Sequence, residues 1–298
     1  MKKIIKRFGG FIGVLVGLGL IAVVLIFALS ETKSNRNFNL PIEQISVPTD
    51  IAAINEGKRL VTFRGCTECH KPNLGGGEFI NAPIGKIDAS NLTRGKGGLT
   101  NFTDADYARA IRHGVSKDGR GLWIMPADDY KSMSDADVGK IIAYIKSIPA
   151  VDNEASTRQL TLLGRALVAF GQIPLISADR IDHTVKAPAM VDITVSVESG
   201  KYLADTCQGC HNPRFSGGSV PGAASNAPLA ANLTPAGNLK NWSETQFIAA
   251  MRTGKTPEGK QIDPQNMPWP SFALMKDDEI KAIFMYLKTL PPTATGAR

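Results

Sequence analysis

One segment of about 100 residues occurs twice in this chain of 298. Each copy opens with Gly-Lys, passes through a Cys-x-x-Cys-His pentapeptide, an Asn-Leu-Thr tripeptide and a Met-Pro dipeptide, and closes with a helical pattern ended by proline. His70 and His211 are 141 residues apart, and so are Asn91 and Asn232. Because a unit of this size can bury its own core, the duplication predicts two similar lobes rather than an array of small repeats.

Composition and the repeat divide the chain into six predicted segments. They are a basic cytoplasmic amino terminus (1–7), a transmembrane helix (8–29), a polar tether (30–48), a first lobe (49–150), an interdomain connector (151–190) and a second lobe (191–298).

Helix signals dominate both lobes, so the predicted fold class is all-α. One helix is expected to enter each pentapeptide from Gly57 or Gly200. Two more helices are expected in each copy, at 103–114 and 134–148 and at 243–254 and 276–290. Strand signals are weak throughout. Residues 160–176 of the connector predict an amphipathic helix that packs on a lobe or lies on a membrane or partner surface.

The apolar run at 8–29 has no charged residue and would extend roughly 33 Å as a helix, enough to cross a hydrocarbon core of about 30 Å. Lys2, Lys3, Lys6 and Arg7 precede it and predict a cytoplasmic amino terminus with everything after residue 30 outside. A cleaved signal peptide is the alternative, because Ala28-Leu29-Ser30 resembles a cleavage site. Both interpretations export the lobes; the length of the run favours an inner-membrane anchor.

The charge of the chain gives no support for nucleic-acid binding. Net charge is +7, but four of the basic residues stand before the apolar run, and 27 acidic residues offset most of the rest. No arginine-rich run or alternation of aromatic and basic residues is present.

All four cysteines fall in the two pentapeptides, CTECH at 66–70 and CQGCH at 207–211. Such a pair can be a thiol redox pair, half a zinc site or, with His following, a haem attachment site. Zinc needs four ligands, which neither lobe supplies, and a thioredoxin-like pair needs a βαβ context. Haem attachment uses every residue, since two thiols form thioethers and the histidine binds iron. The predicted cofactors are therefore two covalently attached haem c groups, held by Cys66, Cys69 and His70 and by Cys207, Cys210 and His211.

The sixth iron ligand is predicted from the repeat. Met125 and Met267 stand at matching places, each before proline and before the final helix. Met133 and Met275 also match, but they begin that helix and are expected in the core. His113 is a rival whose counterpart is Thr253. Ligation of both irons by His and Met fills both axial positions, which favours electron transfer over catalysis.

Three further pairs recur near the presumed pockets: Asn91 and Asn232, Arg112 and Arg252, and Phe102 and Trp242. Each could contact haem propionates or pack on the ring. Helix capping and core packing explain them equally well.

With these motifs placed, the chain resembles class I c-type cytochromes in tandem over residues 50–150 and 195–292. It is similar to membrane-bound dihaem cytochromes and to cytochrome subunits of bacterial dehydrogenases such as alcohol dehydrogenase. The resemblance implies an all-α fold around each haem, with His70 and His211 proximal and Met125 and Met267 distal. This chain has two modules rather than the three of the dehydrogenase subunits.

The expected function is single-electron transfer outside the cytoplasmic membrane, in a respiratory or photosynthetic chain. The chain would link a quinol-oxidising complex or dehydrogenase to a terminal acceptor and act as a carrier rather than an enzyme. The alternatives are a haem enzyme, either a dihaem peroxidase or a sulfur-compound oxidoreductase, and an accessory subunit of a larger respiratory complex.

Overall fold

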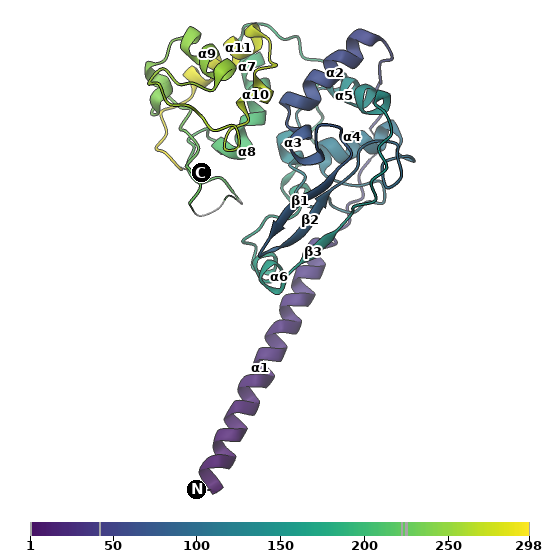
Figure 1. Ribbon diagram of the computed structural model, residues 1–298, viewed down its shortest axis with the longest axis vertical. Helices are drawn as coiled ribbons and strands as arrows, with labels where there is room; N and C mark the ends of the chain where they lie inside the picture. The colour runs from purple at the N-terminus through teal and green to yellow at the C-terminus, as the bar shows by residue number, and fades with distance from the viewer. Residues whose placement is uncertain (1, 42, 222, 224–225, 298) are drawn as a thin grey trace.

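The computed structural model describes the backbone of residues 2–41, 43–221, 223 and 226–297, with their side chains from Gly9 onward. Two helical lobes stand side by side, and one long helix extends from the first of them (Figure 1). The predicted all-α class, with two lobes and an N-terminal apolar helix, is confirmed.

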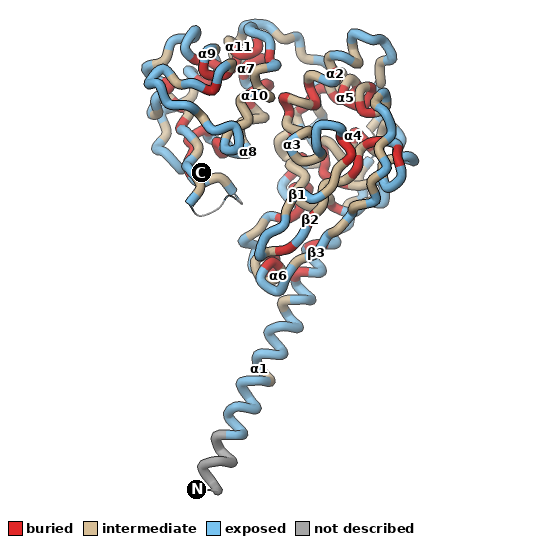
Figure 2. Tube along the Cα trace, in the orientation of Figure 1, coloured by how far each residue is buried: buried red, intermediate tan, exposed pale blue. Residues whose placement is uncertain are grey.

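The long helix is α1 (Lys2–Ser34). Its segment Gly9–Ser34 is long and apolar enough to cross a membrane, and none of its most apolar window is buried in the protein. Figure 2 shows it exposed along most of its length. Its carboxyl end is covered, since Ser30 and Ser34 are buried. The basic residues at 2, 3, 6 and 7, on which the predicted orientation rests, lie outside the described side chains.

The first lobe contains three main helices, with two short elements at the pentapeptide and after Met125. In chain order they are α2 (Ile51–Phe63), α3 (Cys66–His70), α4 (Asp104–His113), the 3-10 turn η1 (Ala127–Asp129) and α5 (Asp135–Ser147). α4 and α5 begin where the sequence placed them, because Thr103 and Ser134 cap them through their side chains. The first helix was expected to run from Gly57, but α2 begins at Ile51 and contains Gly57 in its interior.

The second lobe repeats this order. Its elements are α7 (Val197–Ala204), η3 (Asp205–Cys207), α8 (Gln208–His211), η4 (Asn238–Asn241), α9 (Glu244–Thr253), α10 (Trp269–Phe272) and α11 (Asp277–Thr289). A capping box of Ser243 and Gln246 starts α9, and Gly254 ends it in the left-handed conformation.

In both lobes the first and last helices cross at a glycine. A Cβ on Gly57 would lie 2.0 Å from the carbonyl oxygen of Lys140, and one on Gly200 would lie 1.9 Å from that of Ala282. Only glycine permits backbones to approach this closely. The Gly-Lys that opens each copy of the repeat therefore sets the packing of α2 on α5 and of α7 on α11.

The expectation of weak strand content missed a small antiparallel sheet in the first lobe. It joins β1 (Gly77–Ala82), β2 (Gly85–Ala89) and β3 (Arg158–Leu160) in the order β1-β2-β3. β3 comes from the connector, so the sheet depends on a pairing between segments more than 70 residues apart, such as Gly85 with Leu160. Periodicity within one short segment does not reveal such a pairing.

The connector also forms α6 (Leu162–Ala169) and η2 (Ser177–Arg180). The helix predicted within 160–176 exists but is shorter, and it packs on the carboxyl end of α1. The polar segment that precedes the first lobe in the chain packs along the surface of that lobe. Phe38 and Leu40 contact one buried cluster, and Ile45 and Val47 contact another.

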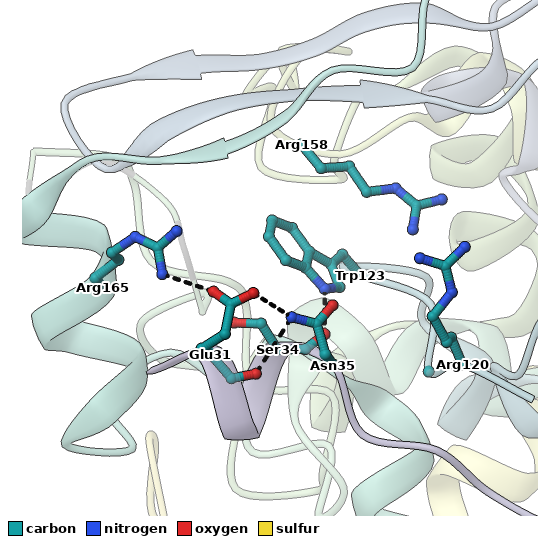
Figure 3. Close-up of a pocket in the computed structure, with 8 residues that line it drawn as sticks. Glu31, Ser34, Asn35, Arg120, Trp123, Arg158 and Arg165 are labelled. Atoms are coloured by element: carbon teal, nitrogen blue, oxygen red, sulfur yellow. Dashed lines mark hydrogen bonds and ion pairs between the residues drawn. The ribbon is translucent and has the colours of Figure 1, made fainter. Parts of the chain in front are cut away.

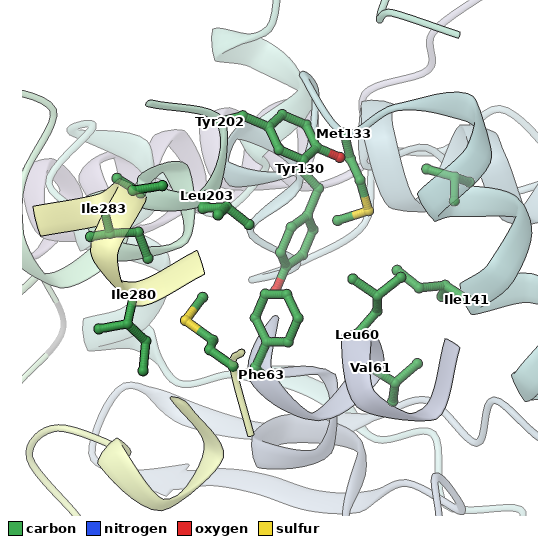
Figure 4. Packing of buried hydrophobic residues seen from close by; sticks show 14 of the residues in the cluster. Leu60, Val61, Phe63, Tyr130, Met133, Ile141, Tyr202, Leu203, Ile280 and Ile283 are labelled. Atoms are coloured by element: carbon green, nitrogen blue, oxygen red, sulfur yellow. The ribbon is translucent and has the colours of Figure 1, made fainter. Parts of the chain in front are cut away.

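The two lobes share one apolar core. Leu60, Phe63 and Tyr130 of the first lobe belong to the same buried cluster as Tyr202 and Ile280 of the second. Figure 4 shows their side chains converging from both lobes. Burial of this cluster holds the lobes against each other.

Candidate functional site

The two Cys-x-x-Cys-His segments have one backbone shape. Each is a short helical turn ending at its histidine, and the chain leaves through a left-handed residue, Lys71 (φ 69°) in one lobe and Asn212 (φ 60°) in the other. Three residues later Leu74 and Phe215 are almost wholly buried, at 0% and 2% exposed. The same geometry arises twice from the two pentapeptides.

Both histidines are held in the tautomer that binds a metal through Nε2. The Nδ1 atom of His70 lies 2.7 Å from the carbonyl oxygen of Ser90, and that of His211 lies 2.7 Å from that of Ala231. A carbonyl only accepts, so each Nδ1 donates its hydrogen and each Nε2 keeps a lone pair. Burial lowers the pKa of both histidines, which keeps the rings neutral.

The four thiols lie in surroundings that oppose ionisation. Burial raises the pKa of Cys66 and Cys207 to about 12 and that of Cys69 to about 11, and it also raises the pKa of Cys210. Reactive or zinc-binding cysteines need accessible thiolates, whereas a thioether carries no charge to desolvate. Within the described residues, no three His, Cys, Asp or Glu side chains group as metal ligands. Both observations disfavour the zinc and thiol-redox interpretations.

The two candidate distal methionines lie at the edge of the core. Met125 and Met267 are partly buried and pack against the cluster that joins the lobes. The backbone turns sharply before Met125, where Ile124 has φ 61°, and the Met125 carbonyl accepts a hydrogen bond of 2.6 Å from Ser177. Their places in the two lobes match.

The other methionine pair and the rival histidine have different surroundings. Met133 and Met275 are 3% and 2% exposed, as expected of core residues. The Nδ1 of His113 lies 2.9 Å from that of His183, and its Nε2 lies 3.3 Å from a carboxylate oxygen of Glu43. Both ring nitrogens of His113 are thus occupied away from the pentapeptide.

The recurrent polar pairs organise loops. Asn91 donates to the carbonyl of Val151, and Asn232 donates to that of Thr293, which fastens each Asn-Leu-Thr turn to the chain after the last helix. Arg112 bonds the Met133 carbonyl and Asp135. Arg252 bonds Asp277, the counterpart of Asp135, and the carbonyl of Ala273, which lies two residues before Met275. These contacts support the packing explanation for both pairs.

Each pentapeptide faces the segment that follows the methionine of the opposite lobe. A Cβ on Gly209, the middle residue of CQGCH, would lie 2.9 Å from a carboxylate oxygen of Asp129. Glu68, the middle residue of CTECH, accepts a hydrogen bond of 2.8 Å from Ser271. Asp129 and Ser271 each lie four residues after the candidate methionine of their lobe. The two contacts occupy matching positions of the repeat and are related by a pseudo-two-fold symmetry that exchanges the lobes.

A second pair of contacts between the lobes is related by the same pseudo-two-fold symmetry. Arg59 of α2 binds Glu279 in the first turn of α11 through two hydrogen bonds of 2.6 and 2.7 Å. Tyr202 of α7 donates a bond of 2.7 Å to Asp137 in the first turn of α5. Arg59 and Tyr202 each stand two residues after the helix-crossing glycine of their lobe. The lobes therefore meet through one patch used twice, as subunits do in a two-fold dimer.

Comparison with known families agrees with this duplicated geometry. The family model for cytochrome c matches the chain in two regions, residues 54–149 and 197–291. Those regions contain both pentapeptides and both Met-Pro dipeptides. This chain belongs to the cytochrome c family.

Several known cytochrome subunits resemble most of this chain. The fructose dehydrogenase cytochrome subunit of Gluconobacter japonicus is 29% identical over 280 residues, which cover 87% of this chain and 57% of that protein. The cytochrome c subunit of the quinone alcohol dehydrogenase of Gluconobacter oxydans is 27% identical over 285 residues, 83% of this chain and 56% of that protein. This cytochrome chain thus spans little more than half the length of either dehydrogenase subunit.

Another relative matches this chain over most of its own length. The protein named diheme cytochrome c-type in Cereibacter sphaeroides is 24% identical over 270 residues, 80% of this chain and 86% of that protein. With two cytochrome c regions in this chain, the cofactors are two haem c groups.

One residue that sequence reasoning missed fits this cofactor. Arg64 is 3% exposed, and its Nε and Nη2 atoms have no hydrogen-bond partner in the described part of the chain. Its guanidinium stacks on the ring of Tyr202 at 5.2 Å, and its charge acts on the thiols of Cys66 and Cys207 in both cytochrome c lobes. Buried guanidinium nitrogens that lack hydrogen-bond partners fit an anionic group, and haem carries anionic propionates. Its signal in the sequence was a break in the repeat, since the residue two before the second pentapeptide is Asp205.

Proposed function

We propose that this cytochrome is a membrane-anchored dihaem electron carrier that passes single electrons between two protein partners on the outer face of the cytoplasmic membrane. Haem c supplies a one-electron iron couple when bound. The protein supplies the attachment, the axial ligands, the burial and the relative placement of the two sites.

The proposed attachment uses both pentapeptides in the same way. Cys66 and Cys69 bind one haem through thioethers, and Cys207 and Cys210 bind the other. The Ser90 and Ala231 carbonyls orient His70 and His211 so that Nε2 is the proximal ligand.

The proposed distal ligands are Met125 and Met267. Their equivalent positions, together with the separate contacts of His113, support this choice. A thioether ligand raises the reduction potential, and two filled axial positions leave no site for oxygen or peroxide. The proposed activity is therefore transfer rather than catalysis.

The observation that carries the proposal is the reciprocal contact of the two sites. Asp129 lies against Gly209, and Ser271 bonds Glu68, so each haem-attachment segment meets the methionine segment of the other lobe across one shared core. Two covalent redox centres in a fixed relative position provide a path from an entry lobe to an exit lobe.

The anchor is proposed from the way α1 joins the first lobe. Trp123 donates a hydrogen bond of 2.7 Å to the Ser34 carbonyl, and Arg165 binds Ser30 and Glu31. Cleavage after residue 30 would remove part of this contact, which supports a retained helix over a signal peptide. The inner membrane and the extracytoplasmic side follow from the basic residues before the apolar run.

The names of the relatives indicate the class of partner. Two of them are cytochrome subunits of fructose and alcohol dehydrogenases. We propose a membrane dehydrogenase or quinol-oxidising complex as donor and a respiratory or photosynthetic acceptor downstream.

Spectroscopy of the intact chain, purified in mild detergent, tests carrier against enzyme. A carrier is expected to show two low-spin haems in the oxidised state and no binding of carbon monoxide or peroxide in either redox state. A high-spin fraction equal to one haem, or stoichiometric peroxide binding, would instead establish an open iron site. Copurification with the tagged chain identifies the redox partner. Recovery of the chain in the soluble fraction of cells would contradict the anchor.

A further inference from the structure

We propose that α6 is an interfacial membrane helix, whose exposed apolar face enters the lipid bilayer beside α1 and fixes the orientation of the first lobe on the membrane. This inference rests on the proposed membrane anchor and goes beyond it. It assigns a lipid-contacting surface to the connector between the two lobes.

The apolar face of α6 has no covering in the protein. Leu162 and Leu163 are 49% and 52% exposed, and Phe170, which ends the helix, is 67% exposed. At 3.6 residues per turn these three side chains fall within an arc of about 100°. The opposite face is buried, with Gly164 and Val168 toward the protein. Three large apolar side chains gathered on one face indicate a surface with a nonpolar partner.

The position of α6 along α1 identifies that partner as lipid. Arg165 binds Ser30 and Glu31 and lies 4.5 Å above the ring of Phe27, while Lys33 donates to the carbonyl of Ala169. The apolar run of α1 ends at residue 29. Since a helix rises 1.5 Å per residue, α6 lies within about 10 Å of the level where the apolar surface of α1 stops. That level is the boundary between acyl chains and headgroups.

The protein surface next to α6 at the same level is polar and basic. A pocket of about 200 Å³ beside the end of α1 is lined by residues that include Arg120, Arg158 and Arg165, with Glu31 as its one carboxylate among the lining residues. Figure 3 shows the guanidinium groups of Arg158 and Arg120 pointing toward each other next to Trp123. Burial and the neighbouring charge of Arg120 lower the pKa of Arg158. Positive charge and a tryptophan at this level complement lipid headgroups.

The geometry of attachment makes the helix a fixed second contact. α6 is joined to the sheet through β3, and a Cβ on Gly164 would lie 1.9 Å from the Ile84 carbonyl at the β1-β2 turn. An anchor helix alone leaves a domain free to tilt. A second apolar contact, rigidly tied to the first lobe, restricts that tilt and places the first lobe nearer the membrane than the second, as in Figure 1.

Site-directed spin labelling of the full-length holoprotein in phospholipid nanodiscs tests the proposal. The native cysteines are held in thioethers, so one added cysteine takes the nitroxide. The probe position is Leu163→Cys. Ile51→Cys is the matched aqueous control, because Ile51 is 72% exposed on α2 of the same lobe. Val16→Cys in α1 reports on the anchor itself. The measurement is the ratio of collision with oxygen to collision with a water-soluble nickel chelate, in the reduced protein, where low-spin iron is diamagnetic.

The three labels separate the possible outcomes. A ratio several-fold higher at 163 than at 51, approaching that at 16, supports the inference. Equal ratios at 163 and 51 with a high ratio at 16 overturn it while leaving the anchor in place. Equal ratios at all three positions overturn both the anchor and the inference. Because Leu163 is exposed, its replacement leaves the core intact, and unchanged haem spectra verify folding.

Discussion

Arg59 and Glu279 lie 220 residues apart in the chain and form a bidentate ion pair between the two lobes. The Glu279 side chain is 4% exposed and that of Arg59 is 16% exposed. At the equivalent place on the other side of the interface, a neutral tyrosine, Tyr202, donates to Asp137. One half of the pseudo-symmetric contact is thus a buried charge pair, and the other is a hydrogen bond.

This asymmetry predicts unequal costs of substitution. Arg59→Met leaves a buried carboxylate without its cation and is expected to lower the free energy of unfolding by about 3 kcal/mol. Tyr202→Phe removes one hydroxyl and is expected to cost about 1 kcal/mol. Denaturant titration followed by circular dichroism measures both. Equal losses would show that the ion pair contributes no more than the hydrogen bond.

The proposed distal ligands predict two independent spectroscopic losses. Met125→Ala and Met267→Ala are each expected to remove about half of the methionine-to-iron charge-transfer absorption of the oxidised protein, and to lower the potential of one haem. Met133→Leu is the matched control, since Met133 is a core residue, and it should keep the full band. A band that survives Met125→Ala intact would exclude Met125 as a ligand.

The buried charge of Arg64 predicts an effect on both haems. A fixed positive charge stabilises the reduced iron, which carries one positive charge less. Arg64→Met is therefore expected to lower both reduction potentials, each by about 1 kcal/mol of reduction free energy. Potentiometric titration measures this. Arg158→Met, which removes an arginine near the end of α1, is the control and should leave both potentials unchanged. A shift confined to one haem would place Arg64 within one site only.

Asp129 predicts a pH dependence of stability. Burial, followed by the charges of Asp128 and Asp205, raises the pKa of Asp129 from 3.8 to about 7, while Arg180 and Lys131 oppose the shift. The folded state therefore holds this proton more tightly than the unfolded state. Its contribution to stability is fully present below about pH 4 and is lost as the pH rises to about 7.

Asp129→Asn should flatten this pH dependence and stabilise the protein by roughly 1 to 3 kcal/mol above pH 7. Denaturant titrations of both proteins at pH 5 and pH 8 provide the measurement. Asp118→Asn is the control at an exposed carboxylate of the same lobe. In this variant the free energy of unfolding should still decrease from pH 5 to pH 8 as in the wild type. If the free energy of unfolding of Asp129→Asn decreased from pH 5 to pH 8 as much as that of the wild type, another group would be responsible for the pH dependence.

Local features of the fold were predictable because their causes lie close together in the chain. Thr103 and Ser243 begin helices through bonds to residues three positions later, and Gly114 and Gly254 end them in the left-handed conformation. The repeat also marked Gly57 and Gly200, although as helix starts rather than helix crossings. It separated Met133 and Met275, as core residues, from the two Met-Pro methionines. Arg64 and β3 escaped prediction because burial and strand pairing involve residues brought together only by folding.

By itself, the sequence determined that this protein has two cytochrome c lobes, where the last two long helices of each lobe begin and end, and which residues are candidates to hold each haem. Those properties depend on spacing, capping and repetition. Only the tertiary structure decided that CTECH and CQGCH face each other's methionine segments, that Arg64 lies buried near both, and that α6 packs at the end of α1. These relationships join residues up to 203 positions apart. The first two arise because two copies of one patch bury a common core.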